Sequence, residues 1–191
     1  MMMKVSTNVA NFERLKACIV YACAKEQPET AQLDHIKLNK VLWYSDAASY
    51  VANGVAITGG KYVRKKHGPV SKYMKSATED LIKTGVLKGG KHFDAARGAW
   101  IDVYNVVGSL EQVYESAEDE TSVRLSDQDK SYIDHAFRGV CLGSDSNTIS
   151  ERTHGEIWEL AHDGEEIPLY AMFAERLGKI TATHMKDAFG R

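Results

Sequence analysis

The sequence predicts a mainly helical domain of the α+β class, built around a central helix over residues 35–53 and completed by a small β element. Several segments carry apolar residues at helical spacing and stop at Gly or Pro, which is typical of packed amphipathic helices. Two other segments, 54–67 and 86–104, place β-branched and aromatic residues near glycines, which favours short strands. Hydrophobic residues make up 43% of the 191 residues, enough for one core.

The first two helices are delimited by capping residues. An apolar stripe predicts a helix over residues 9–26. Asp34 is suited to cap the start of the central helix, and Gly54 is suited to the left-handed conformation that follows a last turn. Because the central helix is apolar on most sides, we expect the other helices to surround it.

The segment after the central helix is predicted to be a loop with one or two short strands within 54–67. The pair Gly68-Pro69 is expected to break the chain before a third helix over 71–84. Residues 86–104 then read as a β-hairpin, similar to the wing of a winged-helix protein.

The C-terminal half is predicted to hold further helices. Residues 105–123 contain five acids and no base before Arg124, so we expect a solvated loop or a short marginal helix there. Ser126, with Asp129 three residues later, predicts the start of a helix that Gly143 ends. The sequence Thr153-His154-Gly155-Glu156 fits a capping box, in which the Thr hydroxyl accepts from the Glu amide.

Pro168 fits the first position of another helix, and a terminal helix is expected over 181–189. The chain is accordingly divided into an N-terminal helix (1–33), a central domain (34–163) and a C-terminal helical extension (164–191).

Charge and cysteine content exclude several classes of protein. The net charge is −2, which disfavours a uniformly basic nucleic-acid-binding protein. The three cysteines form no C-x-x-C pair, so they predict neither a disulfide framework nor a zinc site, and we expect no metal and no cofactor. The chain has no apolar run that could span a membrane and no signal-peptide pattern at Met1–Lys4, so we expect a cytoplasmic protein without membrane contact.

No catalytic motif is present, and we expect no enzyme activity. Nucleophile-elbow, Walker A, dinucleotide-binding and H-E-x-x-H patterns are all missing. Asp46 stands out because it lies in the middle of an apolar helix, with Asn39 on the same face. A buried carboxylate needs a partner, and a nearby Lys or Tyr would stabilise it, which favours a structural role. The alternative is a hydrolase or nucleotide-binding enzyme that uses Asp46 and the Gly59-Gly60 loop.

The strongest local charge lies between residues 54 and 78, where there are six bases and no acid. Such a stretch suits nucleic-acid phosphates, an acidic protein surface, or a strand edge that lysines keep from aggregating. In a strand, Tyr62, Arg64 and Lys66 would share one face. The candidate partner-binding residues are therefore Tyr62, Arg64, Lys65, Lys66 and His67.

Three ordered blocks resemble a known family. The first is Leu38-Asn39-Lys40-Val41-Leu42-Trp43-Tyr44-Ser45-Asp46. The second comprises Gly54, Ile57-Thr58-Gly59, Tyr62 and His67-Gly68-Pro69-Val70, and the third comprises Thr153-His154 with Trp158. Together they resemble the Panacea, or SocA-like, antitoxin domain, which is also found in GepA-like phage-associated proteins. Two departures, Val55-Ala56 in place of a common proline and His67 in place of a tyrosine, bear on loop shape.

The resemblance implies a mostly helical, non-enzymatic domain that neutralises a toxin by direct contact. The matched residues are mainly apolar, Gly, Pro or capping types, so we interpret them as determinants of the fold. They are Leu38, Lys40, Leu42, Tyr44, Asp46, Gly59, Gly68, Pro69, Val70, Thr153, His154 and Trp158. The expected partner is a cognate toxin protein, with a homo-oligomer left open.

The alternative function is a transcription regulator with a winged-helix-like unit, in which the helix 71–84 and the wing 86–104 bind DNA. Against this reading, about sixteen residues separate the second and third helices, too many for the short turn of a helix-turn-helix.

Overall fold

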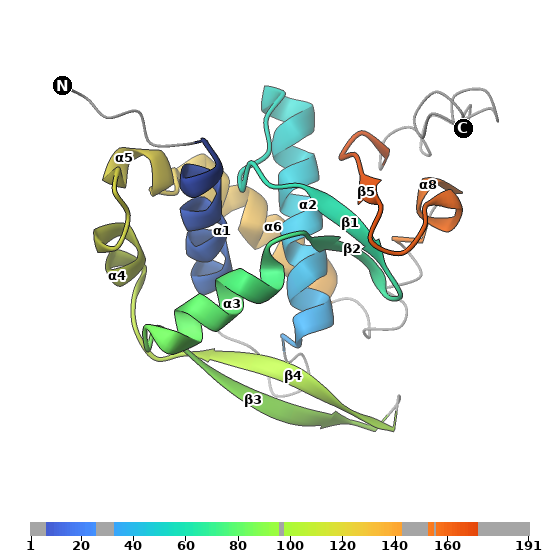
Figure 1. The fold of residues 1–191 in the computed structure, drawn as a ribbon, viewed down its shortest axis with the longest axis horizontal. Helices are drawn as coiled ribbons and strands as arrows, with labels where there is room; N and C mark the ends of the chain where they lie inside the picture. The colour runs from blue at the N-terminus through green and yellow to red at the C-terminus, as the bar shows by residue number, and fades with distance from the viewer. Residues whose placement is uncertain (1–6, 26–32, 96–97, 143–152, 155, 172–191) are drawn as a thin grey trace.

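The computed structural model describes residues 7–25, 33–95, 98–142, 153–154 and 156–171 (Figure 1). It confirms a mainly helical α+β fold. The helices are α1 (Thr7–Cys23), α2 (His35–Asn53), α3 (Met74–Lys83), α4 (Leu110–Glu115), α5 (Glu120–Val123), α6 (Asp127–Cys141) and α8 (Glu156–Leu160). The strands are β1 (Tyr62–Lys65), β2 (Gly68–Ser71), β3 (Leu87–Asp94), β4 (Ala99–Val106) and β5 (Glu166–Ile167).

Helix α2 runs through the middle of the fold and packs against α1, α6, β2 and β4 (Figure 1). Its bounds are those predicted, because both signals that set them are local. The Asp34 carboxylate accepts a hydrogen bond from the Lys37 amide at 2.8 Å, and Gly54 adopts a φ of 75° at the other end. Leu38, Val41 and Leu42 bury their side chains in the core around it.

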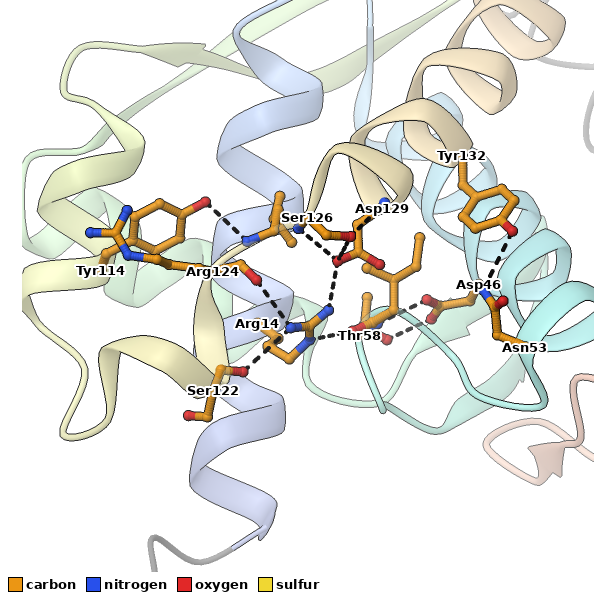
Figure 2. A network of polar contacts seen from close by, with 12 residues as sticks. Arg14, Asp46, Asn53, Thr58, Tyr114, Ser122, Arg124, Ser126, Asp129 and Tyr132 are labelled. Atoms are coloured by element: carbon orange, nitrogen blue, oxygen red, sulfur yellow. Dashed lines mark hydrogen bonds and ion pairs between the residues drawn. The ribbon is translucent and has the colours of Figure 1, made fainter.

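Helix α1 supplies a large share of the same core. Leu15, Cys18, Ile19 and Val20 are each 1% exposed or less. The Arg14 guanidinium joins this helix to three other segments (Figure 2). It donates to the carbonyl of Ile57 at 2.7 Å and to those of Ser122 and Arg124 at 3.4 and 3.3 Å, and it pairs with the Asp129 carboxylate at 3.1 Å.

The segment from 62 to 71 agrees with expectation only in part, because β1 lies within 54–67 as predicted but a second strand follows it. Gly68 and Pro69 do not interrupt regular secondary structure, because they are the first residues of β2. This strand pairs antiparallel with β1, and Tyr62 lies opposite Ser71 and Lys65 opposite Gly68. Proline is tolerated there because β2 is an edge strand of the order β2-β1-β5. Helix α3 therefore starts at Met74 rather than Ser71.

The predicted hairpin over 86–104 is confirmed as β3 and β4, which form a sheet of their own. Leu87 pairs with Val106 at its base, and Phe93 pairs with Trp100 toward its tip. Their two rings contact edge to face at 5.4 Å between centroids, and both side chains are exposed. The hairpin extends along the base of the molecule (Figure 1).

Of the two structures expected for the acidic segment 105–123, a solvated loop or a short helix, the structure shows short helices. The segment forms α4 and α5, whose Val113, Tyr114 and Val123 side chains are buried in the core. The capping pair of Ser126 and Asp129 starts α6 as predicted. Strand β5 was not predicted from the sequence. Gly143 and the predicted helix over 181–189 lie outside the described residues.

Candidate functional site

Residues from the first two motif blocks meet around the Asp46 carboxylate, inside the fold. Asp46 has no exposed surface. Its Oδ1 accepts from the Thr58 amide at 2.9 Å, and its Oδ2 accepts from the Thr58 hydroxyl at 2.5 Å and from the Tyr62 hydroxyl at 2.8 Å (Figure 2 shows the two Thr58 bonds). The Tyr62 ring also packs edge to face on Trp43, at 4.9 Å between centroids.

This environment sets the protonation chemistry of Asp46. Burial raises the pKa of its carboxyl, while the hydrogen bonds from Thr58 and Tyr62 oppose that rise. Burial and the neighbouring Asp46 raise the pKa of the Tyr62 phenol well above its usual value. A carboxylate that three protein donors occupy and that solvent does not reach has no room for a substrate. Asp46 therefore holds the loop 57–62 on α2.

Lys40 marks a second junction, where all three motif blocks meet. Its side chain is 1% exposed, and its Nζ donates to the carbonyl of His67. Gly68 has a φ of 104°, and the space that a Cβ would need there is filled by Lys40 Nζ and Thr153 Oγ1. A glycine is therefore favoured at this position of the second motif block both by backbone conformation and by close approach. The capping box that we expect at Thr153 stays a prediction, because the Glu156 side chain lies outside the described residues.

Trp158, in the third block, packs against β1. Its indole Nε1 donates to the carbonyl of Lys65 at 3.1 Å. The Arg64 Nε donates to the carbonyl of Trp158 at 3.2 Å, and the guanidinium lies 4.4 Å from the indole ring. His154 stacks on the same indole, with ring centroids 3.7 Å apart and planes 5° apart. Burial and the nearby charge of Lys40 lower the pKa of His154.

The structure separates the five candidate partner-binding residues. Tyr62 is 1% exposed, so the expectation that it shares an exposed face with Arg64 and Lys66 is wrong. The face of β1 that carries Tyr62 is turned toward α2, where Asp46 and Trp43 bind it. Arg64 is half-buried on Trp158, whereas Lys65, Lys66 and His67 are exposed at the turn between β1 and β2. Lys65 pairs with Asp163 at 2.8 Å.

Beside this turn lies a groove of about 390 Å³, between the N-terminal halves of α2 and α3, the β1–β2 turn and β4. Cations and histidines at its margin face an apolar floor. Its lining includes Ile36, Asn39, Lys40, Lys66, His67, Val70, Met74, Lys75 and Tyr104. No site role was predicted for Ile36, Met74 or Tyr104, because no local pattern brings α3 and β4 beside the start of α2.

The winged-helix alternative is not favoured by this arrangement. Strands β1 and β2 stand between α2 and α3, where a helix-turn-helix has a short turn. The α3 surface is mixed in charge, since Lys75 and Lys83 are accompanied by an exposed Glu79. Asp80, on the same helix, pairs with Lys16 of α1 at 2.8 Å.

Among the described residues, no group of three or more His, Cys, Asp or Glu side chains is arranged to hold a metal ion. Within the same ranges, no helix has the length and apolar character that crossing a membrane requires.

Comparison with protein families gives a match over residues 38–159 to the model described as "Antitoxin SocA-like, Panacea domain". Comparisons with curated proteins and with solved structures gave no match. The matched range contains both junctions and the groove, apart from Ile36, His35 and Asp163. The chain therefore belongs to the SocA-like, Panacea-domain antitoxin family.

Proposed function

We propose that this chain is an antitoxin that neutralises a cognate toxin in the cytoplasm by direct protein–protein contact. Family membership carries the proposal. The roles of the motif residues agree with it, because Lys40, Asp46 and Gly68 hold the fold together and leave exposed surface for a partner. A non-enzymatic role fits Asp46, whose carboxylate is fully enclosed.

The toxin-facing surface that we propose is centred on the turn between β1 and β2. Lys65, Lys66 and His67 are exposed there, and Arg64 lies beside them on Trp158. Tyr62 is not part of this surface. A basic turn next to an apolar groove suits an acidic partner, because opposite charges at a rim speed association and select the partner.

Co-expression tests this function. Each gene adjacent to the one that encodes this chain is induced in a host with and without the chain. The proposal expects one neighbour that arrests growth alone and is harmless when the chain is present. A Gly68→Ala variant, which forces a Cβ against Lys40, is the matched loss-of-fold control. If no neighbour is toxic, or if a toxic one is not rescued, the antitoxin function is refuted.

A further inference from the structure

The groove beside the β1–β2 turn contains a buried polar atom that the fold leaves unpaired. Asn39 is 4% exposed, and its Nδ2 donates to the carbonyl of His35 at 2.7 Å. That bond fixes the amide orientation, because only the nitrogen can donate to a carbonyl. The Asn39 Oδ1 and the His35 Nδ1, both in the groove lining, have no hydrogen-bond partner among the described residues. Buried polar atoms of this kind are ordinarily paired, and both are closed to solvent in the unbound chain. A donor from outside the fold would therefore complete the site once a neighbouring side chain of the lining moves aside.

The rim of the groove attracts negative charge. Lys66 on the β1–β2 turn and Lys75 on α3 are exposed in its lining, which also includes the buried Lys40. The acid in the lining, Asp163, already pairs with Lys65. Helix α3 adds to this field because its N-cap residue, Tyr73, makes no side-chain cap hydrogen bond. The amides of its first turn and the positive end of its dipole therefore favour an anion.

The floor of the groove favours a ligand that also carries an apolar group. Ile36, Val70, Met74 and Tyr104 line it. A volume of about 390 Å³ lies in the range of ligand pockets and accommodates a few side chains. A ligand that satisfies the whole groove therefore carries an apolar group, a carboxylate or similar anion, and an N–H donor within a short distance of one another.

We propose that this groove receives a short acidic segment of the toxin, in which a large apolar residue is flanked by Asp or Glu. The inference rests on the proposed antitoxin function and names the chemistry of its partner. The apolar side chain lies on Met74 and Tyr104, the carboxylates lie between Lys66 and Lys75, and a backbone N–H donates to Asn39 Oδ1. A polypeptide supplies all three features. Nucleic acid fits less well, because its recognition rests on phosphate contacts and the chain as a whole carries a net charge of −2.

The test uses the full chain and a displayed library of random peptides. Peptides that bind the unmodified chain are sequenced and then titrated against two variants. Lys66→Glu with Lys75→Glu reverses the rim charge. Lys72→Glu is the matched control, since it changes an exposed lysine in the same basic stretch that does not line the groove. We expect enrichment of acidic-apolar peptides, a loss of about tenfold or more in affinity for the rim variant, and little change for the control.

Asn39→Leu supplies a readout that a purely structural residue would not give. The substitution removes the unpaired Oδ1 and also the Nδ2 bond to the His35 carbonyl, at nearly constant volume. Because these two losses have opposite effects on stability, the unfolding midpoint should change little. Peptide affinity should nevertheless fall several-fold, because the N–H of the peptide loses its acceptor. A fall in stability with unchanged affinity would show that Asn39 serves the fold alone, and the assignment of the acceptor would be overturned.

Other outcomes distinguish this proposal from the antitoxin function. If peptides bind the rim variant as tightly as the unmodified chain, the groove proposal is overturned. It is also overturned if ATP or duplex DNA displaces the peptides and itself loses affinity for the rim variant. If a toxin is identified and the rim variant still neutralises it fully, the antitoxin function stands and the groove proposal fails. If no toxin is found but acidic-apolar peptides bind as expected, the groove stands and the antitoxin function fails.

Discussion

Removal of the Tyr62 hydroxyl tests the polar centre that joins β1 to α2. In Tyr62→Phe the ring keeps its edge-to-face packing on Trp43, so no cavity forms, and one buried hydrogen bond to the Asp46 carboxylate is lost. Hydrogen bonds to charged groups contribute about 1.5–3 kcal/mol, so we expect a loss of about 2 kcal/mol in the free energy of unfolding. In a chain of this length that loss lowers the melting temperature by about 4–8 °C.

The cost of this substitution should also depend on pH. Burial raises the pKa of Asp46 in the folded chain, so the folded state holds this proton more tightly than the unfolded state does. The contribution of Asp46 to stability is therefore greatest at low pH and is lost as the pH rises through the raised pKa. Because the phenol binds a carboxylate more strongly than a carboxylic acid, the cost of Tyr62→Phe should shrink as the pH falls through the same range.

Urea unfolding of the unmodified chain and Tyr62→Phe, at neutral pH and at successively lower pH, measures both effects. Tyr62→Ala is the comparison, because it removes the ring as well and should cost about 3–5 kcal/mol by creating a cavity. A cost below about 0.5 kcal/mol for Tyr62→Phe at neutral pH would refute the reasoning, since a buried bond to a charge should contribute more.

Three further outcomes are expected. In thermal unfolding, Gly68→Ala should destabilise the fold far more than Gly54→Ala. Both glycines have a positive φ, but only at Gly68 does Lys40 Nζ fill the space that a Cβ needs. Equal losses of stability in the two variants would contradict this. The pKa of His154 is lowered in the folded chain, so the unfolded state binds the proton more readily. The unmodified chain should therefore lose stability as the pH falls below about 6.5. In urea titrations at several pH values, His154→Phe should make this loss smaller. Deletion of residues 1–33 should abolish cooperative unfolding by circular dichroism, although the family match starts later; a two-state transition would show that α1 is dispensable.

Sequence reasoning succeeded where the signal was local. Asp34 and Gly54 bound α2, and Ser126 with Asp129 starts α6, because a cap depends on residues three or four positions apart. Prediction failed where the sequence does not decide which of the two faces of a strand is buried in the core. Alternation grouped Tyr62 with Arg64, but only the position of Asp46 on α2 decides that the tyrosine is buried.

The acidic segment and the groove show the same limit. Charge count left a solvated loop and a short marginal helix as alternatives for 105–123. It did not predict that Val113 and Tyr114 bury one side of α4 while Glu111 and Glu115 stay exposed. The groove joins residues of α2, α3 and β4 that are far apart in the sequence. The motif blocks include Lys40 and Gly68, which lie together beside the groove. No sequence pattern predicted that Met74 or Tyr104 would lie next to them.

Direct binding to a toxin is the central claim, and calorimetric titration of the purified chain with the purified toxic neighbour tests it most directly. The account predicts saturable binding that is weakened by Lys66→Glu with Lys75→Glu and unaffected by Lys72→Glu. A toxin that the chain neutralises in cells without any measurable binding in the calorimeter would contradict the claim, because neutralisation would then be indirect.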